Sequence, residues 1–145
     1  MASILKVDEL QGKTSAGDIT VTSEGGAATQ SLQQGLAKAW CNIDDVGLTG
    51  ARDSLNISSY TSEATAIFSV SYSNNLSNDD YVTTTGIRDG GGENDTRMIV
   101  GSTTAGYYTT SSQRNYTGGH AASTSNAMSL NDTEVAMLQV TGDLA

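Results

Sequence analysis

From residue 52 onward, short segments alternate apolar and polar residues with the period of two that is typical of β-strands. In residues 66–72, for example, Phe68, Val70 and Tyr72 alternate with serines. The pattern predicts six strands, over residues 52–60, 66–72, 81–87, 97–101, 106–110 and 134–141. The segments between them are rich in Ser, Asn, Gly and Asp and are predicted to be loops, chiefly residues 73–80, 89–95 and 111–120. Strands at this spacing, with no helical pattern between them, predict an antiparallel β-sandwich over residues 41–145.

The N-terminal segment carries two shorter alternating stretches. Leu5 and Val7 flank a lysine, and Ile19 and Val21 flank a threonine, on either side of the turn-prone residues 11–18. Two strands of this length are not stable alone in water, so they must pair with something else. They are either the first hairpin of the main domain or an arm that docks on a partner through these four apolar residues, and we favour the arm.

Residues 28–40 change to helical spacing. Ala28, Leu32, Leu36 and Trp40 recur every four residues, and polar residues fill most positions between them. The stripe is narrow, closer to the seam between associated helices than to the broad face that packs on a sheet. We predict a short helix that either covers one end of the β domain or lies beside identical helices, with Leu32, Leu36 and Trp40 in a trimer interface. The expected domains are therefore an arm with its helix, residues 1–40, and the sandwich, residues 41–145.

Composition favours an ordered oligomer. The 145 residues suit a single domain, or one domain with an arm, and about a quarter of them are Ser or Thr. Ile, Leu, Val and Phe together make up less than a fifth, so the core is thin and self-association would bury more apolar surface. The net charge of −9 repels phosphate and argues against nucleic acid as a partner. No run of about 18 apolar residues predicts membrane insertion, and no basic, apolar leader pattern is found.

Candidate chemistry is sparse. His120 is the only histidine and Cys41 the only cysteine, some 80 residues apart, with no local nucleophile motif and no zinc-ligand spacing. The acidic residues of 44–45, 79–80 and 89–95 lack the alternating spacing of a calcium loop. The sequence therefore predicts a protein that is not an enzyme and that has no cofactor, metal site or catalytic residue.

Residues 86–128 combine long turn-rich stretches with large polar side chains. Tyr107, Tyr108, Arg114 and Tyr116 are of the types that binding surfaces favour, and loops on a rigid sheet are where recognition usually lies. We expect these four residues to face a receptor.

Several stretches resemble small tail-fibre and virion structural proteins of marine and cyanobacterial bacteriophages. The opening ILKVDELQ, a Ser/Gly turn and DITV are similar to the start of such proteins. The resemblance continues through AKAWCNI at residues 37–43, RDSLNISS at 52–59, FSVSY at 68–72 and NLSNDDYV at 75–82. It covers about residues 3–82 and the last strand, whereas residues 86–128 match no part of the family. The family supplies no catalytic residues.

The resemblance implies a structural component of a bacteriophage virion. We expect a homotrimeric tail fibre that attaches by its N-terminus to other virion proteins of the tail, neck or capsid and presents sandwich loops to the host surface, with a surface glycan as a further partner. The alternatives are a capsid decoration or head-fibre protein and a carbohydrate-binding module, in which Tyr60, Tyr107, Tyr108 and Tyr116 would stack on sugars.

Overall fold

The protein is mainly β, as the sequence predicts, and its chain forms two compact units, Met1–Leu36 and Ala37–Ala145. A computed structural model describes residues 4–15, 19–44, 50–88, 96–101, 106–120, 128–130 and 132–144. The division falls after Leu36, whereas the sequence placed it after Trp40. We call the first unit the arm and the second the body.

The arm contains a small antiparallel hairpin. Strand β1, Thr20–Thr22, pairs with β2, Thr29–Ser31, through a loop in which Gly26 adopts a positive φ of 70°. No strand occurs in residues 4–15, so the strand expected at Leu5–Val7 is wrong and β1 pairs forward along the chain. The loop between β1 and β2 is short, so closing it costs less chain entropy than pairing back across residues 11–18.

The helix expected over residues 28–40 is also wrong. Helix α1 spans only Leu32–Gly35, capped by the Ser31 hydroxyl, which accepts a hydrogen bond from the Gln34 amide. Leu36 is already extended, and strand β3, Ala37–Asp44, follows. Strand β3 pairs with β11 along its length, and its residues Ala39, Cys41 and Ile43 are buried. The free energy gained from this pairing and burial outweighs the local preference for a helix.

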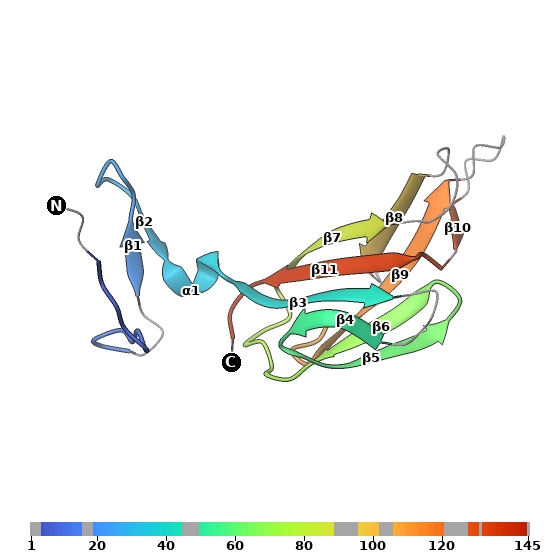
Figure 1. Cartoon of the computed structure of the whole chain (residues 1–145), viewed down its shortest axis with the longest axis horizontal. Coiled ribbons are helices and arrows are strands. Elements are labelled where there is room, and N and C mark those ends of the chain that lie inside the picture. Colours follow the sequence, from blue (N-terminus) through green and yellow to red (C-terminus); the bar gives the residue numbers. More distant parts are fainter. Residues whose placement is uncertain are drawn as a thin grey trace. The chain divides into compact units, whose positions relative to one another are not determined.

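The first sheet of the body contains four antiparallel strands in the order β4-β3-β11-β7 (Figure 1). The bounds not yet given are Gly50–Leu55 for β4, Val82–Arg88 for β7 and Val135–Thr141 for β11. Ala136, Leu138 and Val140 of β11 are buried on one face, as the sequence predicts. This sheet therefore has one core-facing side and one outer side.

The second sheet of the body is built on β9, Ser112–His120. One edge of β9 pairs with β6, Ile67–Tyr72, and farther along with β10, Met128–Leu130, while its other edge pairs with β8, Thr96–Gly101. Strand β5, Ile57–Ala64, pairs with β6. All of these pairings are antiparallel.

Side chains from both sheets meet in one hydrophobic cluster. Phe68, Val70 and Tyr72 of β6 are buried there, as their alternation predicts. The other members are Ala39, Cys41, Ile43, Leu76, Tyr81, Ile99, Ala136, Leu138 and Val140. Burial of these side chains is the main force that holds the two sheets together.

The segment expected as one strand over residues 52–60 is broken at Asn56, which has a φ of 57°. The Asn56 side chain donates to the Lys38 and Asn74 carbonyls and accepts from the Asn74 amide. Asparagine tolerates this left-handed conformation better than most residues. The chain consequently turns from β4 of the first sheet into β5 of the second.

Two predictions around residue 110 are wrong. Residues 106–110 form no strand, and residues 112–120, expected as a loop, form β9. The core-facing positions of β9 are polar, with Gln113, Asn115 and Thr117 all fully buried. Polar residues at the inward positions remove the apolar alternation by which a strand is recognised in a sequence.

Candidate functional site

The loop before β9 folds back on the strand and sets the direction of two adjacent tyrosines. The Thr109 amide donates to the Ser112 carbonyl, and the Thr109 hydroxyl accepts from the Ser112 amide at 3.0 Å. Tyr108 thereby lies opposite Gln113, and the Arg114 amide donates to the Tyr107 carbonyl. Because neighbouring residues of an extended chain point to opposite faces, Tyr107 and Tyr108 leave the loop in opposite directions.

Tyr107 joins a charged and aromatic group on the outer face of the second sheet. The Arg114 guanidinium carbon lies 4.3 Å from the Tyr107 ring centroid and 5.7 Å from that of Tyr116. Arg114 Nη2 also lies 2.7 Å from Glu63 Oε2, and the Ser69 hydroxyl donates to the other oxygen of this carboxylate. We call Tyr107, Arg114, Tyr116 and Glu63 the Tyr–Arg cluster.

The Tyr–Arg cluster is partly exposed, and its arginine is held by an ion pair and two aromatic contacts. Arg114 keeps 17% of its side-chain surface accessible, and Tyr107 and Tyr116 are half-buried. A cation over an aromatic face adds about 0.5–1 kcal/mol at an exposed site. The cluster thus offers two ring surfaces and a fixed planar cation at little entropic cost on binding.

The prediction that Tyr108 shares this surface is corrected. Its ring stacks on Tyr81 with centroids 5.5 Å apart, and its hydroxyl lies against Gly101, where no side chain stands in the way. Burial raises the Tyr108 pKa, although a hydrogen bond with Thr83 opposes the shift. Tyr108 therefore packs against the core and is absent from the Tyr–Arg cluster.

Behind the cluster, the inner side of β9 carries a row of buried polar contacts. Gln113 Oε1 accepts from the Tyr72 hydroxyl at 2.9 Å and from the Thr83 hydroxyl at 3.0 Å. Gln113 Nε2 donates to Asn115 Oδ1, also at 3.0 Å. These bonds link β9 to β6 and to β7 of the other sheet, and they offset the cost of burying polar groups.

Of the two residues weighed for nucleophilic chemistry, one is buried and the other lies outside the described side chains. Burial raises the pKa of Cys41 to about 12, against a weaker lowering by a hydrogen bond with the Leu138 backbone. The thiol is therefore protonated at neutral pH and is a poor nucleophile. The backbone of His120 ends β9, and nothing is described of its side chain.

The residues predicted for attachment lie in the arm. Leu5 and Val7 are exposed, at 80% and 55%, whereas Ile19 is half-buried and Val21 exposed in or beside β1. None of the described residues in 4–15 and 19–36 is buried. The arm therefore presents apolar side chains that it does not cover itself.

The three residues predicted for a trimer interface do not share one element. Leu32 lies in α1, Leu36 follows it and is exposed, and Trp40 belongs to β3 in the body. Leu32 and Leu36 line a small hollow of about 240 Å³ together with Val21. A helical seam through Trp40 is consequently wrong, and only the two leucines can contribute to an interface made by the arm.

Trp40 instead borders a groove on the outer face of the first sheet. The groove has a volume of about 420 Å³ and crosses β3, β11 and β7. Gln139 of β11 lies beside Trp40 on one side and Thr84 on the other, and the next row consists of Asn42, Met137 and Gly86. We call this hollow the Trp40 groove.

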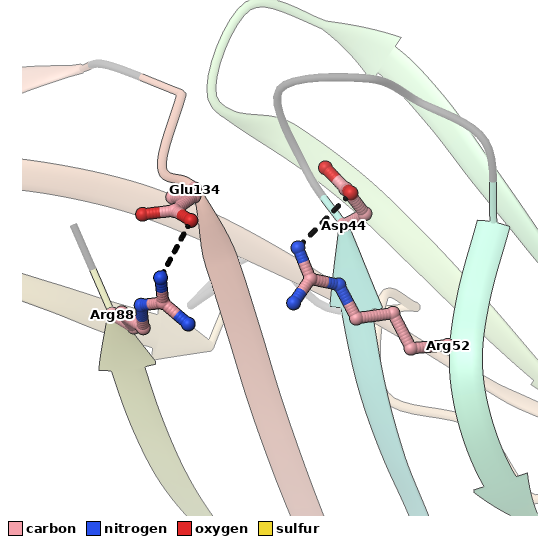
Figure 2. A network of polar contacts seen from close by, with 4 residues as sticks. All are labelled: Asp44, Arg52, Arg88 and Glu134. Atoms are coloured by element: carbon pink, nitrogen blue, oxygen red, sulfur yellow. Dashed lines mark hydrogen bonds and ion pairs between the residues drawn. The ribbon is translucent and has the colours of Figure 1, made fainter. Parts of the chain in front are cut away.

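Two ion pairs lie beyond one end of these rows. Arg52 Nη2 lies 3.1 Å from Asp44 Oδ2, and Arg88 Nη2 lies 2.9 Å from Glu134 Oε1 (Figure 2). The register shift in the β3–β4 pair skips Arg52, and such a bulge redirects the side chain that it displaces. Both pairs are partly exposed, so each contributes at most about 1 kcal/mol to stability.

Sequence reasoning named Trp40 and Cys41 among the residues of the groove, each for another role, and missed Glu63 in the Tyr–Arg cluster. Residues that come together from three strands leave no local signal, although the alternate spacing of Arg114 and Tyr116 was available. Within the described ranges, no three His, Cys, Asp or Glu side chains gather in a group that could hold a metal ion. The acidic residues 89–95 lie outside those ranges. No helix of the described chain is long and apolar enough to cross a membrane.

Comparison with known proteins adds no assignment to this geometry: no protein-family model, no curated protein and no solved structure matches the chain.

Proposed function

We propose that the chain is a structural component of a bacteriophage virion, a trimeric fibre in which the arm attaches to the particle and the body is a β-sandwich that faces the host. The observation that carries this proposal is the exposed apolar surface of the arm. Ile4, Leu5, Val7 and Leu10 are each more than half exposed in a unit separate from the body. Uncovered apolar side chains on this scale are typical of a surface made to bind another protein.

The hairpin of the arm supports the same proposal. The two strands β1 and β2 form a sheet of their own, so each has a second edge that no described strand covers. Such edges pair readily with a strand of another chain. Other virion proteins of the tail, neck or capsid would supply the partner for attachment.

Trimer formation is proposed through the residues that follow the hairpin. Leu36 is 55% exposed and borders the hollow formed with Leu32 and Val21, into which a side chain of another copy fits. A homotrimer would bury these apolar side chains in each of its three copies, and this added burial would compensate for the thin core of each chain.

The body would present the Tyr–Arg cluster to the host surface. Tyrosine and arginine dominate the energetics of many interfaces, and here both are already held in place before binding. A host surface glycan is the partner we propose for Tyr107, Arg114 and Tyr116.

The test compares matched variants of the full chain in phage particles. Replacing both Leu5 and Val7 by Asp is expected to abolish incorporation into the particle, because the apolar contact is lost, while Lys6→Ser in the same segment is expected to leave copy number unchanged. Arg114→Ala is expected to be incorporated normally and to lower adsorption to host cells about tenfold. Quantitative mass spectrometry of purified particles gives copy number, and an adsorption assay gives binding.

The oligomeric state is measured separately by light scattering. A trimer has three times the 15.0 kDa mass of the chain, and replacing Leu32 and Leu36 by Ser is expected to yield folded monomer. Normal copy number of the Asp variant would contradict attachment by the arm, and a wild-type monomer would contradict the trimer.

A further inference from the structure

We infer that the Trp40 groove is a binding site for neutral sugar residues of a polysaccharide. The groove lies on the first sheet, whereas the Tyr–Arg cluster lies on the second, so this site is independent of the virion role proposed above. The inference is carried by the mixed lining of the groove, by the lack of charge in that lining and by a buried acceptor, Asn42 Oδ1, that has no described partner.

The lining combines apolar surfaces with neutral hydrogen-bonding groups. Trp40 and Met137 supply the apolar part, and Asn42, Thr84 and Gln139 supply amides and a hydroxyl. A sugar ring has the same mixed character, because its C–H faces pack on aromatic rings while its hydroxyl groups donate and accept hydrogen bonds. Amides and hydroxyls both donate and accept, which matches a hydroxyl group better than a charged side chain does.

The lining of the groove is uncharged. No residue that lines it is charged, and Asp44 and Glu134 at one end are each paired with an arginine (Figure 2), while Asp53 of β4 lies beside Asn42. The lining therefore offers no charged group to bind an ionic ligand directly, and the nearby Asp53 carboxylate disfavours an anionic one. A neutral ligand is the class that this lining fits.

One acceptor in the lining has no hydrogen-bond partner among the residues that the structure describes. Asn42 Oδ1 is buried without a hydrogen bond, which costs about 1–3 kcal/mol. A sugar hydroxyl that enters beside Trp40 supplies the missing donor after a small rotation of the Asn42 amide. Binding would remove a cost that the free protein bears.

Gly86 lets the Met137 side chain lie close to β7 at the floor of the groove. A β-carbon built at Gly86 would stand 3.3 Å from the Met137 methyl group, so a leucine at this position would displace the Met137 side chain and take up space in the hollow. The row formed by Asn42, Met137 and Gly86 thus becomes a floor beside the Trp40 ring. Substitution at Gly86 closes the site without removing any of its binding groups.

The test uses Trp40 as its own reporter, because the chain contains one tryptophan. The full chain is titrated with cellotetraose, maltotetraose and chitin tetrasaccharide while the tryptophan emission is recorded. We expect a saturable blue shift with at least one of them, with a Kd of about 1 mM, and calorimetry gives the same constant independently. Because the ligand is neutral, added salt should leave this constant unchanged.

Three variants locate the site. Gly86→Leu fills the groove and should abolish the saturable shift, and Gln139→Ala should weaken binding about tenfold by calorimetry. Thr61→Ala, on the exposed side of β5 in the other sheet, is the matched control and should bind as the wild type does. Far-UV circular dichroism verifies the fold, and Gln139→Ala decides the question if Gly86→Leu does not fold.

Three results would overturn the inference. The first is the absence of saturation with all three sugars. The second is a blue shift that follows protein concentration instead of sugar, since a second copy would then cover the groove. The third is a folded Gly86→Leu or Gln139→Ala variant that binds like the wild type.

Discussion

The arm and the body use apolar residues in opposite ways. In the body, β6 and β11 place their apolar residues inside, where Phe68 and Ala136 are at most 1% exposed. In the arm, Ile4 and Leu5 are about four-fifths exposed, and no described residue is buried. The body therefore carries its own core, whereas the described part of the arm leaves its apolar side chains uncovered.

The largest expected effect separates the two units by stability. Phe68→Ala should lower the free energy of unfolding by about 3–5 kcal/mol, because it removes a large buried ring and leaves a cavity. Leu5→Ala, a substitution of similar chemistry in the arm, should change it by less than about 0.5 kcal/mol. Urea denaturation of both variants measures the difference. If both variants lost the same free energy of unfolding, the contrast between arm and body would be wrong, because the arm would then unfold together with the body.

A smaller effect is expected where two side chains compete for one space inside the body. Gly101→Ala would place a methyl group in the position that the Tyr108 hydroxyl occupies, so the variant should lose about 2 kcal/mol of stability through overpacking. Gly86→Ala is the control and should be nearly neutral, because its new methyl group would stand closest to the flexible methyl end of Met137, at 3.3 Å, and in ordinary contact with the rest of that side chain. Thermal unfolding of both variants distinguishes the two cases.

The last effect vanishes at neutral pH and develops only above pH 9, as a pH dependence of stability that originates in the body. The pKa of Cys41 is raised from 9.0 to about 12 in the folded protein by burial. Above pH 9 the unfolded thiol loses its proton while the folded one retains it, so the unfolded state gains stability. The free energy of unfolding should fall by about 1.4 kcal/mol per pH unit between these values.

Tyr81 contributes to the same decline from a higher pH. Burial raises its pKa from 10.0 to about 12, so its share begins near pH 10. Cys41→Ala should remove the decline between about pH 9 and pH 10 and make it less steep between pH 10 and pH 12, where only the tyrosine share should remain. Urea unfolding at a series of alkaline pH values measures both parts, and a wild-type profile in the variant would rule out Cys41 as the source.

The sequence was informative wherever core-facing positions carry large apolar residues. Strands β6 and β11 follow from the alternation of Phe68 with Val70 and of Leu138 with Val140. Strand β9 could not be recognised, because its inward residue Gln113 is polar and accepts hydrogen bonds from Tyr72 and Thr83, which only the fold brings near. Strands are predicted from the alternation of apolar and polar residues, so a strand whose core-facing residues are polar is not predicted.

Strand β3 shows a different limit of the sequence. Leu32, Leu36 and Trp40 have helical spacing, but the alternation of Ala39, Cys41 and Ile43 in the same stretch was also present and is the pattern that the fold uses. Small side chains at two of those positions made the strand signal weak. The groups of the candidate site were less predictable still, because Tyr107 reaches Arg114 only through the turn at Thr109.

The position of β3 has a mechanical consequence for a protein held by its arm. The chain enters the body at the start of β3, which lies between β4 and β11 in the first sheet (Figure 1). Hydrogen bonds between antiparallel strands are perpendicular to the strands, so tension directed along β3 loads the bonds on both of its sides together. Pulling β3 out of the first sheet would then require breaking its hydrogen bonds to β4 and β11 together, whereas an edge strand could be peeled away one bond at a time.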